Sequence, residues 1–222
     1  MNIKKKSIIA LGVVLLILII DQASKIWVKT SMVPYDEGSI QIASWFKIYF
    51  VENPGMAFGW TFGGDGESGK QFGKLFLSLF RIIAIGFIGY YLTRIIKKNY
   101  SAGFVVCIAL IWAGAFGNII DSVFYGEIFT ASYPGHVASL VPFGEGYGSL
   151  LHGKVVDMLY FPLIEGNFPS WFPGDWANSP FIFFSPIFNI ADSAITVGIF
   201  LLLIFYRKEL SHSLEGENKK NK

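Results

Sequence analysis

Four apolar stretches dominate this 222-residue sequence and limit the folds that are open to it. They cover residues 7–28, 74–96, 102–124 and 187–206, and each approaches the roughly 20 apolar residues that a helix needs to cross a bilayer. Hydrophobic residues make up 53% of the chain and charged residues only 15%, which is more apolar than a soluble globule requires. We therefore predict a mainly α-helical integral membrane protein, with four transmembrane helices in one domain spanning residues 1–222.

The distribution of basic residues predicts the orientation of these helices. Lysine and arginine cluster before the first stretch, between the second and third, and after the fourth: Lys4, Lys5, Lys6, Arg94, Lys97, Lys98, Arg207, Lys208, Lys219, Lys220 and Lys222. The positive-inside rule places all three clusters, both termini and the tail 207–222 in the cytoplasm. The formal net charge is only +2 and no basic stripe is interleaved with aromatic residues, so no nucleic-acid partner is expected.

The first stretch also has the lysine-rich start and apolar run of a cleavable signal peptide. However, no small-x-small cleavage site closes the run, which instead meets Asp21, Gln22 and Lys25. We favour a helix that is retained in the protein.

Two long connections, residues 29–73 and 125–186, then face the outer side and rest on the bundle. The segment "IASWFKIYFVEN" (Ile42–Asn53) has the β-branched and aromatic content of strands and is followed by an Asn-Pro-Gly turn, which predicts a small extracytoplasmic β-sheet. The second connection is a long loop segment in which Trp171 and Trp176 resemble anchors at the depth of the lipid headgroups.

Four aspartates stand where an apolar environment should disfavour them. Ionisable groups within membrane spans cost several kcal/mol unless they face a protein interior or a cavity. Asp21 and Asp121 end the first and third stretches, Asp192 begins the fourth, and Asp157 lies in the apolar outer segment "VVDML". The predicted topology places all four near the outer face. Asp21 stands four residues before Lys25, and we interpret these two as a structural ion pair within one helix.

Two carboxylates brought within hydrogen-bond distance cannot both ionise readily, so one pKa rises, the other falls, and the two share a proton. Such a pair can activate water and protonate a leaving amine, as in aspartic proteases. Spacing alone does not decide which two of Asp121, Asp157 and Asp192 form the pair.

Other chemistries have weaker support in the sequence. It contains no His-Glu-x-x-His and no Gly-x-Ser-x-Gly motif, and its three histidines, His136, His152 and His212, are scattered, so no metal or cofactor is expected. The single cysteine, Cys107, is interpreted as a packing residue. A small transporter or proton-relay protein would place its acids near mid-bilayer on broken helices. A structural scaffold would tolerate changes of aspartate to asparagine.

Five segments, in order along the chain, resemble the signature motifs of the lipoprotein signal peptidase family. They are "DQASK" (Asp21–Lys25), "VENPGMAFG" (Val51–Gly59), "GAFGNIIDS" (Gly114–Ser122), "VVDM" (Val155–Met158) and "FNIADSAITVG" (Phe188–Gly198). The Asn-x-Ala-Asp motif that enters the last apolar stretch is the most specific of them.

This resemblance implies a multi-pass aspartic endopeptidase (signal peptidase II) of the bacterial cytoplasmic membrane, with its active site near the extracytoplasmic face. Such an enzyme removes the signal peptide from diacylglyceryl-modified prolipoproteins, cutting just before the lipid-modified cysteine. Membrane lipid is the other expected partner, and peptide inhibitors such as globomycin are expected to bind at the catalytic dyad. The resemblance assigns that dyad to Asp157 and Asp192.

The resemblance also implies a set of residues that bind substrate or shape the site: Asn53, Gly55, Asn118, Asp121, Asn189 and Ala191. In two respects the chain departs from the family pattern. Ser122 stands where the family has an arginine, so the positive charge of that arginine is missing here. Lys154 is the candidate residue to replace this charge. A loop rich in Gly, Ser and aromatic residues is also inserted between Asp121 and Asp157.

Overall fold

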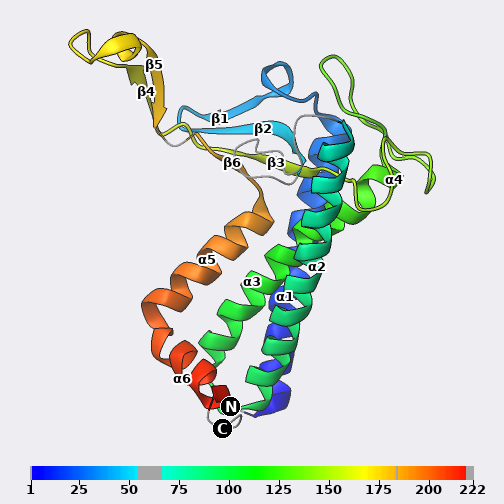
Figure 1. Cartoon of the computed structure of the whole chain (residues 1–222), viewed down its shortest axis with the longest axis vertical. Coiled ribbons are helices and arrows are strands. Elements are labelled where there is room, and N and C mark those ends of the chain that lie inside the picture. The colour runs from blue at the N-terminus through cyan, green and yellow to red at the C-terminus, as the bar shows by residue number, and fades with distance from the viewer. Residues whose placement is uncertain (1, 55–66, 184, 219–222) are drawn as a thin grey trace.

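The computed structural model describes residues 2–54, 67–183 and 185–218, and shows a bundle of long helices that carries a small sheet at one end (Figure 1). The helices are α1 (Ile3–Ser31), α2 (Glu67–Lys97), α3 (Ala102–Ile120), the short α4 (Gly126–Ile128), α5 (Ile190–Phe205) and α6 (Arg207–Asn218). One π-helical turn, η3 (Asp121–Tyr125), continues α3, and two 3₁₀ turns are η1 (Asp36–Gly38) and η4 (Gly174–Trp176).

Six strands form two antiparallel sheets among the described residues. The four-stranded sheet has the order β1 (Ile40–Ala43), β2 (Phe46–Asn53), β3 (Val155–Tyr160) and β6 (Ile187–Phe188), and a separate hairpin pairs β4 (Ile164–Asn167) with β5 (Pro180–Phe183). The predicted small sheet is therefore present, and β1 and β2 account for most of the segment that predicted it.

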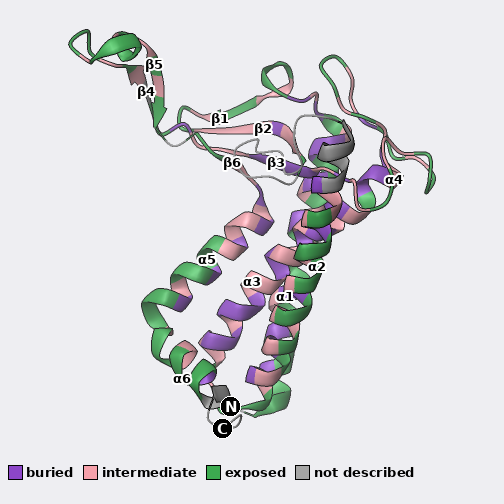
Figure 2. Cartoon of the chain, viewed as in Figure 1, coloured by how far each residue is buried: buried purple, intermediate pink, exposed green. Residues whose placement is uncertain are grey.

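Three helices are long and apolar enough to cross a membrane: α1, α2 from residue 73, and α3 through residue 128. Helices α5 and α6 meet this criterion only together, with an 86° bend between them, so the candidate spans among the described residues number three, or four if the bent pair is one span. Large apolar side chains on the outside of α1 and α5 are exposed, as expected for surfaces that face lipid (Figure 2): Leu11, Leu16, Ile19, Phe200, Leu203 and Ile204. The prediction of a mainly helical membrane protein is confirmed.

Small residues allow α3 and α5 to pack closely. A Cβ atom added at Gly114 would stand 2.2 Å from the Ala191 carbonyl oxygen, and one added at Gly198 would stand 2.9 Å from the Cys107 carbonyl oxygen. Glycine at these positions lets the two backbones approach, as is common between membrane helices. Cys107 is only 1% exposed within the helical core, which fits its interpretation as a packing residue.

The sheet is held to the bundle by a second apolar core at the end of α1. Its buried members are Val28, Met32, Phe50, Tyr125, Phe129, Val156 and Met158. Because side chains alternate along a strand, Val156 and Met158 face this core and Asp157 between them faces the other side of the sheet. The hydrophobic packing of β3 therefore determines the direction in which Asp157 points.

Two elements were not predicted. The tail forms a helix, α6, which packs against the loop between α2 and α3 through a hydrogen bond from Ser101 N to Glu209 Oε2 (2.9 Å). The hairpin of β4 and β5 projects beyond the sheet on the side away from the helices (Figure 1). Trp171 and Trp176, which are 77% and 59% exposed, lie in this hairpin.

Candidate active site

The start of α5 positions Asp192. Asn189 is the N-cap of this helix: its side-chain oxygen accepts a hydrogen bond from Asp192 N (2.9 Å), and Asp192 Oδ2 accepts one from Asn189 N (3.4 Å). This reciprocal arrangement, a capping box, requires a spacing of three residues, which the Asn-x-Ala-Asp motif provides. A carboxylate in the first turn is also stabilised by the helix dipole. Asp192 is thus held at the end of the bundle that carries the sheet.

The sheet positions Asp157 beside that helix end. Asp157 is 4% exposed, its Oδ2 accepts a hydrogen bond from Asn53 Nδ2 (3.1 Å), and its Oδ1 accepts one from Asn189 Nδ2 (2.7 Å). In the register of β2 and β3, Val51 lies opposite Asp157. Asn53 is two residues further along β2 and so lies on the same face, which explains why its amide reaches the carboxylate.

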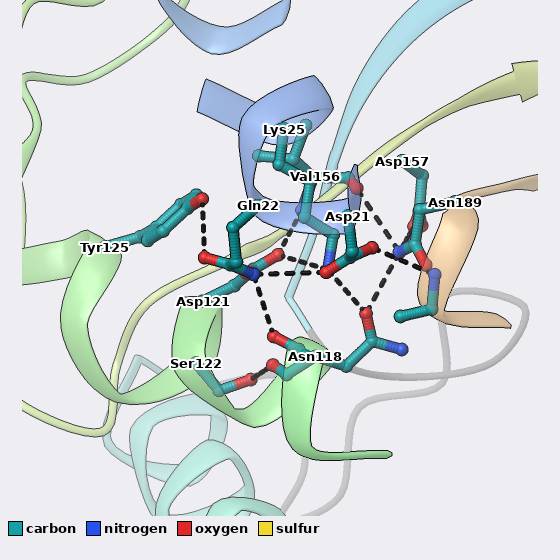
Figure 3. A network of polar contacts seen from close by, with 12 residues as sticks. Asp21, Gln22, Lys25, Asn118, Asp121, Ser122, Tyr125, Val156, Asp157 and Asn189 are labelled. Carbon is teal, nitrogen blue, oxygen red and sulfur yellow. Dashed lines mark hydrogen bonds and ion pairs between the residues drawn. The ribbon is translucent and has the colours of Figure 1, made fainter. Parts of the chain in front are cut away.

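The amide of Asn118, on α3, connects the two aspartates. Asn118 Nδ2 donates to Asp192 Oδ1 (2.7 Å), and Asn118 Oδ1 accepts from Asn189 Nδ2 (3.1 Å) and from Lys25 Nζ (2.8 Å). Figure 3 shows that the amide of Asn189, which contacts Asp157, also contacts the side chain of Asn118. Asp157 and Asp192 are therefore held at one site, by strands and helices that are distant in the sequence.

The environment of Asp157 favours its protonated form. Burial, reinforced by the negative charge of Asp192, raises the pKa of the Asp157 carboxyl to about 7, although hydrogen bonds from Asn53 and Asn189 act in the opposite direction. A carboxyl group with this pKa can both accept and release a proton near neutral pH, which general acid and base catalysis requires.

The raised pKa predicts a pH dependence of stability. An unfolded aspartate has a pKa near 4, so the folded protein binds the extra proton between about pH 4 and pH 7, and its free energy of unfolding falls as pH rises through this window. The expected loss is about 4 kcal/mol. Thermal unfolding of detergent-solubilised protein at pH 5 and pH 8 measures the part of this loss that falls above pH 5, about 3 kcal/mol. The Asp157→Asn variant should lack this pH-dependent part of the free energy of unfolding. An unchanged pH dependence in the variant would contradict the raised pKa of Asp157.

A buried ion cluster lies next to the two aspartates (Figure 3). Lys25 Nζ is 2.9 Å from Asp21 Oδ2 and 2.9 Å from Asp121 Oδ2, and all three side chains are fully buried. The interpretation of Asp21 and Lys25 as a pair satisfied within one helix was therefore incomplete, because Lys25 also binds Asn118 on α3 and Asp121 on η3. The ammonium group therefore joins α1 to α3 and η3.

The two buried aspartates of this cluster extend it to the rest of the site. Asp21 Oδ1 accepts a hydrogen bond from Ala191 N (2.9 Å) on α5. Asp121 Oδ2 accepts one from Val156 N (3.2 Å), the residue directly before Asp157 on β3. The chain enters β3 close to η3, since a Cβ at Gly153 would stand 2.0 Å from the Asp121 carbonyl oxygen. The cluster thus fixes the positions of both β3 and α5.

Some residues of the site were not predicted. Gln22 Nε2 donates to Asp121 Oδ1 (2.9 Å), and Gln22 Oε1 accepts from Tyr125 Oη (3.1 Å). The sequence signal for Gln22 is its position next to Asp21 in the "DQASK" segment, in which we predicted a role only for Asp21 and Lys25. Of the residues that were predicted, Gly55 lies outside the described residues.

The inner face of β2 carries a second ion cluster. Glu52 binds both Lys29 and Lys154, and the Lys154 Nζ to Glu52 Oε2 distance is 2.8 Å. Burial alone would raise the pKa of Glu52, but these two ammonium groups outweigh it and hold the pKa below its usual range. Lys154 is therefore engaged on the face of the sheet opposite Asp157. The positive charge of Arg81, on α2, interacts with the carboxylates of both Asp157 and Asp192.

Comparison with known proteins assigns the chain to a family. A family model described as signal peptidase (SPase) II matches residues 13–207. The chain belongs to the signal peptidase II family. A protein of Porphyromonas gingivalis (strain ATCC 33277) named lipoprotein signal peptidase is 51% identical over 207 residues, which cover 93% of this chain and 86% of that protein. The protein of the same name from Amoebophilus asiaticus (strain 5a2) is 36% identical over 206 residues, covering 92% and 80% respectively.

A solved structure shares the architecture of this signal peptidase II. It is described as a bacterial membrane enzyme determined by the in meso method at 1.9 Å resolution, and it matches with a TM-score of 0.54 and 25% identity over 88% of this chain and 90% of that one. Family membership makes the chain a protease, and the fold similarity agrees with the apolar helices in indicating a membrane enzyme.

Proposed function

We propose that this signal peptidase II is an aspartic endopeptidase whose catalytic dyad is Asp157 and Asp192. It removes the signal peptide from diacylglyceryl-modified prolipoproteins by cutting just before the lipid-modified cysteine. The observation that carries this proposal is the pair of carboxylates held at one site by the amides of Asn189 and Asn118. Family membership supplies the substrate class, since the relatives are named lipoprotein signal peptidases.

The geometry supports a division of labour within the dyad. Asp157, whose pKa is raised to about 7, holds the shared proton at neutral pH and hydrogen-bonds the scissile carbonyl. Asp192, at the N-terminus of α5, accepts a proton from the attacking water, which then adds to the carbonyl carbon. As the tetrahedral intermediate collapses, the carbon–nitrogen bond breaks and a proton passes to the leaving amine. The amides of Asn53 and Asn118, together with Ala191, shape the surface on which the peptide lies.

The position of the dyad suits a substrate that stays anchored in lipid. In this proposal four spans, the last formed by α5 with its bend into α6, cross the bacterial cytoplasmic membrane, with both termini cytoplasmic and the sheet outside. The dyad then lies at the outer ends of α3 and α5, where lipid meets water. A diacylglyceryl cysteine can keep its acyl chains in the bilayer while its scissile bond reaches the two carboxylates.

Cleavage of a defined substrate tests this function. We expect the purified protein in detergent to cleave a prolipoprotein that carries diacylglyceryl cysteine, and mass analysis to locate the cut directly before that cysteine. The matched control is the same precursor without lipid, which should remain intact. A globomycin-type peptide should block the reaction by occupying the dyad. Equal cleavage of the two precursors, or a cut elsewhere in the chain, would contradict the proposed specificity.

A further inference from the structure

The end of the bundle opposite the aspartates carries a hollow lined by lysine residues. The start of α1 and the loop between α2 and α3 border an open, shallow hollow of about 500 Å³, lined by Asn2, Ile3, Lys4, Lys6, Lys97, Lys98 and Asn99. Four of these seven residues are cationic and none is acidic. A larger hollow of about 930 Å³ adjoins it, shares Lys98 and Asn99, and adds Lys208, Glu209 and His212 from α6. The acid of this lining, Glu209, is engaged by Ser101 N (2.9 Å). A region with this charge is complementary to an anion.

Lys6 gives a second, independent indication of an anion. Its side chain is only 3% exposed, and its Nζ donates to the Lys98 carbonyl oxygen (2.9 Å). Within the part of the chain that the structure describes, no carboxylate forms an ion pair with this ammonium group. A buried charge is costly unless it is paired, because the protein interior solvates it poorly. A bound anion would supply the missing partner.

In the membrane topology proposed above, the hollow lies at the level of the lipid headgroups. It is placed where α1 begins, α2 ends and α3 is about to begin, and these are the three helices that can cross a membrane. Helix α6 turns by 86° from α5 at this end and so runs along the same surface (Figure 1). The anion expected at this position is the phosphate of a membrane lipid, because basic pockets between the ends of membrane helices bind lipid headgroups.

We propose that this lysine-lined hollow is a binding site for the phosphodiester headgroup of an anionic phospholipid. Lys97, Lys98 and the buried Lys6 bind the phosphate oxygens, and the adjoining hollow beside α6 receives the remainder of the headgroup. The lipid joins the start of α1, the loop between α2 and α3, and α6, at the end of the protein opposite the dyad.

Native mass spectrometry of the full-length protein with short-chain phosphatidylglycerol tests the proposal. One lysine near an anionic group contributes about fivefold to affinity, so the double variant Lys97→Gln/Lys98→Gln should bind this lipid about 30-fold more weakly. Both lysines are exposed, so the variant should fold normally. The matched control is Lys5→Gln/Arg94→Gln, which removes two charges from the same end without changing the lining of either hollow. The control should bind nearly as tightly as the unchanged protein.

Three results would overturn the proposal. Equal binding of phosphatidylglycerol and the zwitterionic phosphatidylcholine would show that charge does not select the lipid. Equal weakening in the two double variants would show that the overall charge, and not this hollow, is responsible. Displacement of the lipid by inorganic phosphate, at an ionic strength matched with chloride, would identify the occupant as a soluble anion.

Discussion

Replacing either carboxylate of the proposed dyad by its amide is expected to abolish cleavage while leaving the fold intact. Asp157→Asn and Asp192→Asn should each lower kcat by at least about 1,000-fold, because an amide can neither accept nor supply the proton that the reaction moves, and such transfers contribute about 100-fold to 10,000-fold. Gel-shift assays on the lipid-modified precursor measure the loss. Because asparagine has nearly the shape of aspartate, thermal unfolding should show that both variants remain folded.

The matched control for these variants is Asp175→Asn. It makes the same chemical change at an exposed residue of the β4–β5 hairpin, remote from the dyad, and it should cleave normally. Near-normal activity in either dyad variant would remove that residue from the catalytic pair. Normal activity in both Asp157→Asn and Asp192→Asn would favour a structural role, in which these residues form hydrogen bonds and do not transfer a proton.

Replacing Lys25 by methionine is expected to cause the largest loss of stability. The change leaves the carboxylates of Asp21 and Asp121 fully buried without their cation, and breaking a buried ion pair in this way costs about 3–5 kcal/mol. We expect Lys25→Met to accumulate poorly in membranes and to unfold at a much lower temperature. Adding Asp121→Asn to Lys25→Met should recover part of this loss, because one of the two unpaired charges is then removed.

Lys154→Met provides the comparison for Lys25. The Lys154 side chain is 33% exposed, and its partner Glu52 keeps the second lysine, Lys29, after the change. The expected cost is therefore only about 1 kcal/mol. If the two lysine variants unfolded at the same temperature, the cluster around Lys25 would not be the structural link that its contacts indicate.

The long apolar helices of this protein could be predicted from the sequence, whereas the tail helix α6 and much of the sheet could not. An apolar stretch such as residues 102–124 has one stable form in lipid, so length and composition suffice to identify the helix. The segment "VVDMLY" has no such constraint. Because this segment is short and apolar, its pattern does not show whether it is a strand or the end of a buried helix. It becomes β3 by pairing with β2, which lies about 100 residues earlier in the chain.

The site could be predicted in part. The topology placed four aspartates near one end of the bundle, and the contacts of Lys25 and Asn189 bring them together there. Spacing alone could not choose between Asp121 and the other acids. In the structure these acids differ in the groups that bind their carboxylates. Asp121 forms an ion pair with Lys25, whereas Asp157 accepts hydrogen bonds from the amides of Asn53 and Asn189. Partners that come from distant segments are not visible in a local pattern.

The double role of Asn189 has a consequence for how the outer connections can move. Its side chain contacts Asp157 and its backbone contacts Asp192, so the gap between the two acids is set by the dimensions of a single amino acid. The hairpin and the inserted loop attach to the sheet outside this link. The inserted loop is tied to η3 and to the end of α4 by backbone hydrogen bonds, such as those from Gly153 N to Ser122 O and from Tyr147 N to Phe129 O. Of the two segments, the hairpin is therefore the one whose displacement would leave the spacing of the two acids unchanged.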